Sequence, residues 1–295
     1  MTTNMLFFSI IIPTYNRAHL ISKTIQSVLD QTYKYFEIIV VDDGSTDNTE
    51  EVIGLMNDRR IKYFKKENEE RSIARNYGME KANGDFIYLL DSDDIIYRNH
   101  LQLAYDFINK NKTVEIFFFP YEIINTNTGK TRKIPTIKGS LNEYLAHGNI
   151  LSCHGVFFIK KIAKTYRFRP DMYQGEDYEF WLRVSSKYEI LYTNTITSAL
   201  IEHPSRGVLK INKDDLINQK FKLINYALKN EDVQKKYGHL MDLIISNAYT
   251  YIALHLAISK KHRKDSIKFL LKGLHQNPRS LFKKRTLAII KHIIV

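Results

Sequence analysis

The segment GDFIYLLDSDD, residues 84–94, is the most informative part of this sequence. Its first half contains an apolar run from Phe86 to Leu90 that predicts a buried strand, and its second half is a cluster of carboxylates. Carboxylate oxygens suit hard cations such as Mg²⁺ and Mn²⁺, which proteins usually hold through one or two carboxylates together with substrate phosphates. The stretch therefore predicts a phosphate-bearing ligand. The alternative is a purely structural loop, since acidic loops after strands often do no more than cap the next helix.

Two further apolar runs end in polar loops in the same way. The segment PTYNR (13–17) follows the apolar run 8–12, and VDDGSTDNT (41–49) begins with the last residue of the apolar, β-branched run 38–41. In an open parallel sheet, ligands bind beyond the carboxyl ends of the strands, so all three loops are expected to line one cleft. The alternative for the second loop is the N-cap of a following helix, provided by Ser45, Thr46 or Asp47.

A third motif, RSIARNYG at 71–78, predicts a helix that runs to about Ala82. Arg71 and Arg75 are four residues apart and share a face of that helix. Guanidinium groups near a helix N-terminus favour anions, and Arg suits bidentate contact with phosphate or carboxylate. The alternative is a solvated ion pair with Glu67, Glu69 or Glu70.

Together with GEDYEFWLR at 175–183, these motifs resemble the inverting family-2 glycosyltransferases of the GT-A fold. PTYNR, VDDGSTDNT, ARNYG (74–78), GDFIYLLDSDD and GEDYEFWLR occur in the order and at the spacing usual in that family, and the resemblance covers residues 5 to about 205. It implies an α/β fold whose Rossmann-like mixed sheet is flanked by helices. We expect a catalytic domain over 1–207, with a nucleotide-binding half over about 1–97 and an acceptor half over about 98–207.

The resemblance also implies roles in the nucleotide-binding half. In such enzymes the nucleotide of the sugar donor lies across the first strand ends, and the carboxylates of DSD bind ribose and a divalent cation, Mn²⁺ or Mg²⁺, that bridges the diphosphate. Asp93 would be the metal ligand and Asp91 would bind ribose or metal, whereas Asp94 is explained equally well as a cap for the helix expected near Asn99. The donor-binding candidates are Pro13, Thr14, Tyr15, Arg17, Asp43, Ser45, Arg71, Arg75, Asp91 and Ser92.

Among these candidates, three have more specific implied roles. Thr14 and Tyr15 would flank the base of the nucleotide, and Asp43 would accept a hydrogen bond from the base or the ribose. Each assignment follows from the position of the residue in the family motif.

GEDYEFWLR supplies the acceptor side of the reaction. Direct displacement at the anomeric carbon of a sugar needs a base, opposite the leaving nucleotide, that takes the proton from the acceptor hydroxyl. By resemblance Asp177 is that base, and Glu176 orients substrate or backbone. Trp181 anchors the following helix in the core and is also a candidate contact for the acceptor. The alternative is that the two acids only cap this helix.

Between the metal loop and this motif, the pattern is less regular. Residues 114–121 and 151–159 predict strands, and Asn125–Gly129 predicts a hairpin turn. His154, in the second of these strands, is a candidate contact for acceptor or sugar, although a histidine in an apolar strand is more often a structural residue.

Two residues beyond the GEDYEFWLR motif are candidates by resemblance alone. His203 and Arg206 lie where family members often place a group near the donor diphosphate, and His203 is also a candidate metal ligand. A surface turn at Pro204 is the competing explanation of this segment.

Composition agrees with a soluble enzyme. The chain has 295 residues, of which 44% are hydrophobic and 26% charged, an ordinary globular balance. Its single cysteine, Cys153, excludes an intrachain disulfide and favours a reducing compartment. The N-terminal apolar run is too short to span a membrane and ends at Pro13, and no other segment approaches a spanning length without charges. We expect a cytoplasmic enzyme.

The C-terminal region, 208–295, shows helical periodicity and predicts an all-α appendage. Apolar residues recur at helical spacing over 216–228, 233–258 and 266–274, and Asn277-Pro278 predicts a break. Eleven Lys or Arg residues and one acid lie between 258 and 295, so this end carries most of the formal net charge of +12.

The final segment, Leu281–Val295, is amphipathic when it is placed on a helix. A basic amphipathic helix can lie on an anionic membrane surface, which would make the enzyme peripheral on the inner face of the cell membrane. The alternative is a packed terminal helix with a solvated basic face. We expect no nucleic-acid partner, because the segment has no recognised binding module and few aromatic residues for stacking.

These features predict a metal-dependent inverting transferase. It would move a hexose or N-acetylhexosamine from a nucleotide-diphosphate donor, by family frequency UDP, to a saccharide or lipid-linked saccharide acceptor in polysaccharide or glycolipid synthesis. The motifs do not specify the sugar, the linkage or the oligomeric state. The alternative is a catalytically silent nucleotide-sugar binding protein, which would not need Asp177. A dehydrogenase or nucleotidyltransferase is disfavoured because the chain has no Gly-rich phosphate loop.

Overall fold

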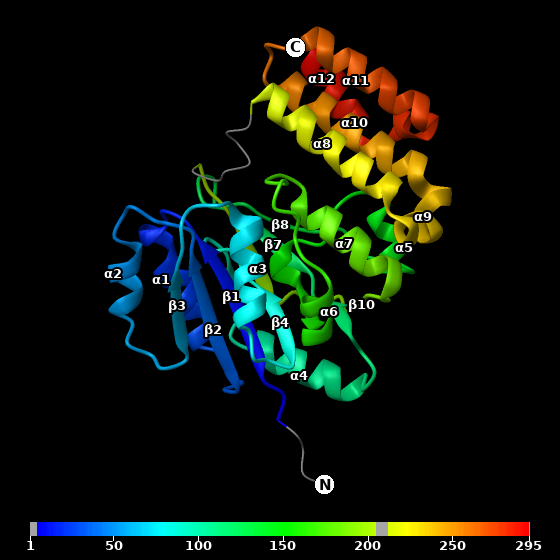
Figure 1. The fold of residues 1–295 in the computed structure, drawn as a ribbon. Helices are drawn as coiled ribbons and strands as arrows, with labels where there is room; N and C mark the ends of the chain where they lie inside the picture. Colours follow the sequence, from blue (N-terminus) through cyan, green and yellow to red (C-terminus); the bar gives the residue numbers. More distant parts are fainter. Residues whose placement is uncertain (1–4, 205–211, 295) are drawn as a thin grey trace. The chain divides into compact units, whose positions relative to one another are not determined.

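The computed structural model describes residues 5–204 and 212–294 (Figure 1). The chain divides into two compact units. The first consists of Met1–Leu141, Leu151–Tyr173 and Tyr188–Arg206, and the second consists of Asn142–Ile150, Gln174–Lys187 and Gly207–Val295. The GEDYEFWLR motif therefore lies entirely in the same unit as the C-terminal helices. The functional boundaries near residues 97 and 207 stay predictions.

A seven-stranded mixed sheet forms the centre of the first unit. In spatial order its strands are β10 (Leu191–Tyr192), β6 (Ile116–Phe118), β9 (Val156–Ile159), β4 (Phe86–Leu89), β1 (Phe8–Thr14), β2 (Phe36–Asp42) and β3 (Ile61–Lys65). The last four are mutually parallel, and β9 is antiparallel to both of its neighbours. Strands β1 and β2 are buried along their whole length, which explains their almost continuous apolar sequence.

Helices flank this sheet, as predicted. They are α1 (Ala18–Leu29), α2 (Thr49–Gly54), α3 (Arg71–Lys81), α4 (His100–Lys110) and α6 (Lys160–Thr165), and Figure 1 shows β1, β2 and β3 side by side among them. The core joins strand residues such as Ile10 and Ile38 to helix residues such as Ile25 and Leu101. Helix α3 ends next to Ala82, as the sequence predicted.

The strand register brings the predicted loops to one edge of the sheet. Thr14 at the end of β1 pairs with Asp42 at the end of β2, and Ile11 pairs with Leu89 at the end of β4. The carboxyl ends of the three strands therefore meet, as predicted. Because β9 is antiparallel to β4, the residues that precede β9, including His154, lie at the same edge.

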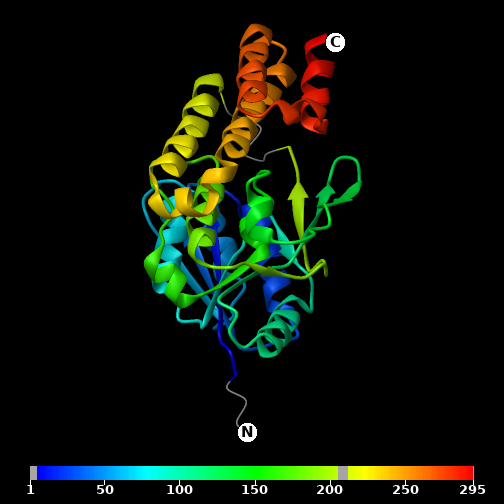
Figure 2. The same ribbon diagram turned by 90° about the vertical axis from the view of Figure 1, so that its right-hand side faces the viewer.

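A four-stranded sheet completes the first unit. Its strands, in spatial order, are β5 (Ile95–Ile96), β11 (Ser198–Glu202), β7 (Tyr121–Asn125) and β8 (Thr131–Lys133), and Figure 2 shows β11 beside the β7–β8 hairpin. The hairpin turn predicted at 125–129 is confirmed, since the Asn125 side chain accepts hydrogen bonds from the backbone N–H groups of Asn127 and Thr128.

Two strand predictions were wrong in their bounds. Residues 114–121 form no single strand: β6 ends at Phe118 in one sheet, and β7 begins at Tyr121 in the other. Pro120 lies between them and lacks the N–H that a continuous ladder needs. The strand predicted over 151–159 begins only at Val156, because Cys153–Gly155 forms a 3-10 turn.

The second unit is helical. Its helices are α5 (Leu141–Leu145, which starts in the first unit), α7 (Glu176–Lys187), α8 (Lys213–Lys229), α9 (Glu231–Tyr237), α10 (Met241–Ile258), α11 (Arg263–Gln276) and α12 (Lys284–Ile294), with a 3-10 turn at Pro278–Phe282. Residues of α8, α10, α11 and α12 form one apolar cluster that includes Leu216, Ile252, Phe269 and Ile289. The predicted helices and the break at Pro278 are confirmed.

One described segment, Glu231–Ile258, is long and apolar enough to cross a membrane by composition alone. We expected no such segment; it arises because α9, a short 3-10 turn and α10 follow one another without a gap. Over half of its most apolar window is buried in the protein, and Ile252, Ala253 and Leu256 lie in the apolar cluster. This burial is what a core helix of the unit requires.

Helix α12 divides its apolar side chains between the interior and the surface. Thr286 and Ile289 are buried, whereas Leu287 and Ile294 are exposed, and Phe282 in the preceding turn is 84% exposed. The packed-helix alternative is thus correct for one side of the helix. Membrane contact by the exposed side stays a proposal.

Candidate active site

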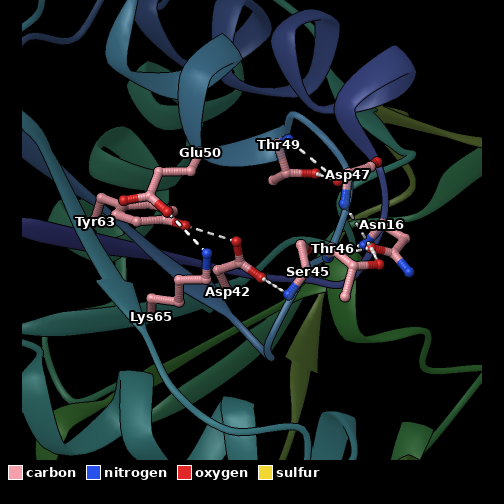
Figure 3. Close-up of polar contacts among 9 residues, drawn as sticks. All are labelled: Asn16, Asp42, Ser45, Thr46, Asp47, Thr49, Glu50, Tyr63 and Lys65. Carbon is pink, nitrogen blue, oxygen red and sulfur yellow. Dashed lines mark hydrogen bonds and ion pairs between the residues drawn. The ribbon is translucent and has the colours of Figure 1, made fainter.

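The loops after β1 and β2 are hydrogen-bonded to each other (Figure 3). The Asn16 N–H donates to Ser45 Oγ (2.8 Å), and Asn16 Oδ1 accepts from the backbone N–H of Thr46 (2.8 Å). The Asp42 carboxylate accepts from the Ser45 N–H (2.8 Å) and from the Tyr63 hydroxyl (2.6 Å). Burial and this carboxylate together raise the pKa of Tyr63, so the hydroxyl stays a donor. The contacts fix the shape of the VDDGSTDNT loop.

Asp47 connects the starts of two helices. Its carboxylate accepts hydrogen bonds from the Ala18 N–H at the start of α1 (3.1 Å) and from the Thr49 N–H at the start of α2 (3.1 Å). These are N–H groups that have no partner within their own helix. The N-cap residue of α2 is Asn48, so the predicted N-cap was wrong in its position, although the Asp47 carboxylate one residue earlier satisfies the Thr49 N–H. Ser45 serves the loop contact with Asn16.

Asp43 is buried and paired with a lysine that sequence reasoning missed. Lys66 Nζ lies 2.8 Å from Asp43 Oδ1, which also accepts from the Glu69 N–H (3.1 Å). Gly44 has a φ of +80°, and a Cβ there would come within 2.9 Å of the Asn68 N atom, so only glycine allows the two loops this close. No sequence pattern indicates this role for Lys66, because the residue stands in a charged run that resembles a solvated surface.

The end of β1 places the remaining predicted donor-binding residues. Pro13 and Thr14 are buried, and among the described residues the Thr14 hydroxyl has no hydrogen-bond partner. The Tyr15 ring is 46% exposed, as a ring that stacks on a base must be. Arg17, half-buried, precedes α1, and its Nη1 donates to the Asn16 carbonyl (3.4 Å).

Arg75 and Asp91 form a buried ion pair. Arg75 Nη2 donates to Asp91 Oδ1 (2.7 Å), and the guanidinium lies 5.4 Å from the Phe168 ring centroid. Arg75 is buried, whereas Arg71, one turn earlier, is exposed at the helix start. Arg75 thus has a partner in the DSD loop. The guanidinium orients Asp91 and offsets its negative charge at the strand edge.

Asp94 does not cap a helix, and that alternative was wrong. It is fully buried, accepts a hydrogen bond from the Ile201 N–H (2.8 Å) and lies 3.1 Å from His154 Nδ1. Helix α4 begins only at His100. Asp94 therefore connects the DSDD loop to β11 and to the turn before β9.

His154, in the turn before β9, is the residue that Asp94 contacts there. It is fully buried, its Nδ1 is 2.9 Å from Ser152 Oγ, and its ring centroid is 4.5 Å from that of Tyr121. These contacts favour the structural alternative for His154. Its contact with acceptor or sugar stays a prediction.

Asp93 and His203 are the residues that suit a divalent cation. Asp93 Oδ2 is 3.0 Å from His203 Nε2, and Ser92, which precedes Asp93, is buried. Within residues 5–204 and 212–294, no group of three or more His, Cys, Asp or Glu side chains forms a complete metal site. One carboxylate and one imidazole nevertheless fit a cation whose other ligands are substrate phosphates. Arg206 lies outside the described residues.

In the second unit, the predicted base lies in the first turn of α7. Asp177 is half-buried, and its carboxylate accepts from Asn149 Nδ2 (2.8 Å) and from the Tyr178 N–H (2.8 Å). The second contact shows that Asp177 also contributes to capping. Glu176 is buried, and Trp181 is fully buried against Phe180, so Trp181 anchors the helix. A role for Trp181 in acceptor contact stays a prediction.

A buried lysine lies next to this motif. Lys220 Nζ is 3.2 Å from the point where a Cβ on Gly175 would stand, and 4.2 Å from the Tyr251 ring centroid. Burial lowers the pKa of Lys220 to about 8, although Asp177 and Glu176 oppose this shift. Sequence reasoning missed Lys220, since a lysine in an amphipathic helix is normally solvated.

Comparison with known sequences identifies a family. The sequence profile of Glycosyl transferase family 2 matches residues 9–167. An uncharacterized glycosyltransferase of Haemophilus influenzae is 30% identical over 251 residues, which cover 84% of this chain and 96% of that protein. The Escherichia coli UDP-Glc:alpha-D-GlcNAc-diphosphoundecaprenol beta-1,3-glucosyltransferase WfgD is 37% identical over 177 residues, or 60% of this chain and 68% of that protein. An uncharacterized glycosyltransferase of Rickettsia conorii is 28% identical over 97% of this chain, which spans only 47% of that protein.

Solved structures share the fold. TarS 1–349 of S. aureus, in complex with UDP-GlcNAc, superposes with a TM-score of 0.72 at 20% identity, covering 98% of this chain and 89% of that one. The mannosyltransferase PcManGT from Pyrobaculum calidifontis, in complex with GDP-Man and Mn²⁺, superposes with a TM-score of 0.61 at 18% identity. The superposition covers 99% of this chain and 86% of that one. The predicted GT-A fold class, a mixed sheet with flanking helices and further C-terminal helices, is confirmed.

Proposed function

This chain belongs to glycosyl transferase family 2, and we propose that it transfers a sugar, with inversion, from a nucleotide-diphosphate donor to the hydroxyl of a lipid-linked saccharide. The observation that carries the proposal is that three acids of the loops at the carboxyl edge of the seven-stranded sheet, Asp43, Asp91 and Asp93, are each paired with a basic residue, in that order Lys66, Arg75 and His203. Ligands of such sheets bind at that edge.

The first unit binds the donor in this proposal. Tyr15 stacks on the base, and Asp43, held by Lys66, accepts a hydrogen bond from base or ribose. Asp91, oriented by Arg75, contacts the ribose, and Asp93 and His203 hold Mn²⁺ or Mg²⁺. When bound, the cation offsets the negative charge of the departing diphosphate.

Asp177 of the second unit acts as the base. The acceptor oxygen forms a bond to the anomeric carbon while the bond from that carbon to the diphosphate breaks. The proton of the acceptor hydroxyl moves to the Asp177 carboxylate, and the nucleoside diphosphate leaves with the electron pair. The Asn149 amide, 2.8 Å from this carboxylate, holds it in place.

Donor and acceptor classes are inferred from similar proteins. WfgD is named for UDP-Glc and a GlcNAc-diphosphoundecaprenol acceptor, and TarS binds UDP-GlcNAc. These names support a UDP-sugar donor and a lipid-linked acceptor in polysaccharide or glycolipid synthesis.

A peripheral membrane position at the inner face of the cell membrane completes the proposal. A lipid-linked acceptor requires the enzyme to reach the membrane. The exposed side chains of Phe282, Leu287 and Ile294 and the basic residues of the same segment have the composition of a surface-binding helix.

The test is a turnover screen of nucleotide sugars with Mn²⁺ or Mg²⁺. We expect release of UDP from a UDP-sugar, abolished by a metal chelator and restored by added cation. Preference for a GDP- or thymidine-linked sugar would contradict the donor assignment. Failure of every donor, with and without saccharide acceptors, would contradict the proposed function.

A further inference from the structure

Two cations from different helices meet on one aromatic ring in the second unit. Lys220 Nζ of α8 is 4.2 Å, and Arg285 Cζ of α12 is 5.9 Å, from the ring centroid of Tyr251 on α10. A third cation is close by, since Lys283 and Arg285 both bond to Asn247: Lys283 Nζ donates to Asn247 Oδ1 (3.2 Å), and Arg285 Nη1 donates to the Asn247 carbonyl (3.1 Å).

The hydrogen bonds of Lys283 and Arg285 to Asn247 go to neutral acceptors, and Lys220 contacts the neutral ring of Tyr251. In the parts of the chain that the structure describes, no carboxylate oxygen lies within 4.0 Å of the charged nitrogens of Lys220, Lys283 or Arg285. By contrast, exposed lysines of the same unit do form ion pairs, as Lys187 does with Asp232 (2.5 Å). Buried charges in proteins are normally paired. The cluster therefore has unused capacity for an anion.

The arrangement is electrostatically unfavourable without a ligand. Burial lowers the pKa of Lys220 to about 8 and also lowers the pKa values of Lys283 and Arg285. The positive charge of Arg285 lowers the pKa values of both lysines further, whereas Asp177 and Glu176 oppose the shift of Lys220. Two positive charges in a partly buried setting repel by several times the energy that they would have in water. A bound anion removes this repulsion, and buried charges maintained at such a cost are typical of functional sites.

The cluster lies next to the catalytic motif. Lys220 Nζ is 3.2 Å from the position of a Cβ on Gly175, two residues before Asp177, and both Asp177 and Glu176 act on its pKa. An anion bound at Lys220 would therefore stand close to the loop that carries the base.

Exposed apolar side chains adjoin the same cations. Leu281 and Phe282, which directly precede Lys283, are 44% and 84% exposed. Anion-binding nitrogens beside exposed apolar groups match a molecule with an anionic head and a hydrocarbon tail.

We propose that Lys220, Lys283 and Arg285 bind the diphosphate of a lipid-linked saccharide acceptor and thereby place the acceptor sugar at Asp177. This inference rests on the proposed function and assigns the acceptor diphosphate to named residues. Free diphosphate shares the binding chemistry, whereas the sugar and the lipid distinguish the acceptor.

The first experiment compares two soluble acceptors of the same sugar, one carrying a diphosphate with a short alkyl chain and the other a plain alkyl glycoside. We expect the wild-type protein to show a lower KM for the diphosphate acceptor. Lys220→Met and Arg285→Gln should each raise that KM roughly 10- to 100-fold, the effect of one hydrogen bond to a charged group, so that the preference is lost. Lys272→Met is the matched control, because its ammonium also lies over a ring, 5.8 Å from Tyr249, but is exposed.

The second experiment measures pyrophosphate binding by phosphorus NMR with the donor site saturated by UDP. We expect binding to the wild-type protein and to Lys272→Met, and weaker binding to Lys220→Met and Arg285→Gln. Because the two substitutions lie on different helices, misfolding of one variant leaves the other as a test.

Several outcomes would overturn the inference. Equal KM values for the two acceptors in the wild-type protein would contradict it. An equal rise of the KM values for both acceptors in Lys220→Met would also contradict it. A loss of UDP affinity in the same variant would assign the cations to the donor diphosphate, and a parallel loss of binding to phosphatidylglycerol vesicles without acceptor selectivity would assign them to lipid headgroups. Absence of all transfer by the wild-type protein would instead contradict the proposed function.

Discussion

Asp93 and His203 are 110 residues apart in the sequence, yet Asp93 Oδ2 lies 3.0 Å from His203 Nε2. Asp93 comes shortly after the end of β4, a strand of the seven-stranded sheet. His203 comes directly after the end of β11, a strand of the four-stranded sheet. The two sheets of the first unit therefore meet at this pair. Its ligand chemistry leads to the first prediction.

Asp93→Asn should remove metal-dependent nucleotide binding. The amide keeps the shape of the side chain but not its charge, so the cation loses its only carboxylate in the pair. We expect turnover to fall by at least about 10²-fold, because charge stabilisation by a metal ion contributes several kcal/mol. Calorimetry of UDP with and without Mn²⁺ measures the effect, and Asp106→Asn, an exposed acid on α4, is the control. Unchanged Mn²⁺-dependent binding would remove Asp93 from this role.

Asp177→Asn should separate catalysis from capping. Asn retains the shape and can still accept from the Tyr178 N–H, so a purely structural role predicts a stable and largely active protein. Loss of the base predicts a fall in transfer of roughly 10²–10⁴-fold with nearly unchanged UDP affinity.

The measurement is the transfer rate beside nucleotide affinity in the same variant. Substantial residual transfer would move the base elsewhere, with Glu176 the first alternative. A product with retained anomeric configuration by NMR would contradict the inverting mechanism.

Lys220→Met should stabilise the protein at neutral pH. The pKa of Lys220 is lowered from 10.5 to about 8 in the folded state, so the unfolded chain binds more protons between these values. The lysine therefore destabilises the fold below pH 8, and this effect fades as the pH rises toward 10.5.

We expect a gain of roughly 1–3 kcal/mol in the free energy of unfolding at pH 7. The pKa shift of Lys220 sets the upper value of this gain, and the loss of the favourable contact between Lys220 and the Tyr251 ring reduces it. Urea unfolding at pH 7 and pH 10.5 measures the gain. A variant less stable than the wild type at pH 7 would contradict the assigned burial cost. Lys220 faces Glu176 and Asp177 of α7, Tyr251 of α10 and Arg285 of α12, so the same titration in Arg285→Gln tests their contribution.

Asp47→Ala should destabilise the first unit. Its carboxylate serves the N-termini of α1 and α2 at once, and loss of one N-cap typically costs about 1 kcal/mol, so we expect about 1–2 kcal/mol. Thr46→Ala is the control, because the main contact of Thr46 with Asn16 uses its backbone N–H. The free energies of unfolding of the two variants are compared by urea unfolding. If they differ by less than about 0.5 kcal/mol, water replaces the hydrogen bonds that the Asp47 carboxylate accepts.

Phe282→Ser combined with Leu287→Ser should weaken binding to vesicles that contain phosphatidylglycerol. Both side chains are exposed, so the substitutions remove apolar surface without opening the core. Wild-type binding should also weaken as salt rises, because the segment is basic. Co-sedimentation measures both effects, and Leu55→Ser, an equally exposed apolar residue of the first unit, is the control.

Equal vesicle binding by the double variant and the wild-type protein would exclude this surface from membrane contact. Truncation after Pro278 is a poorer test than these substitutions. It would remove Ile289, which is fully buried in the apolar cluster, and so we expect it to destabilise the second unit.

Much of the fold was predictable because its signals are local. The apolar runs before PTYNR, VDDGST and DSDD specify the central strands, and the three- and four-residue spacing after residue 212 specifies helices. Parallel register then requires the polar loops to share one edge. Pro120 misled the strand prediction, because its missing N–H divides one apolar run between two sheets.

The motifs of the chain are enough to predict the family, the strand-end loops and the residue types that such a site needs. The pairs of residues, in contrast, follow from three-dimensional packing: Asp43 with Lys66, Asp91 with Arg75, Asp94 with His154 and Ile201, and Lys220 with Arg285 around Tyr251. Periodicity reports which face of an element is buried, since burial repeats along the chain. The partner of a buried charge depends instead on which distant element packs against it, and that follows from the packing of the whole chain.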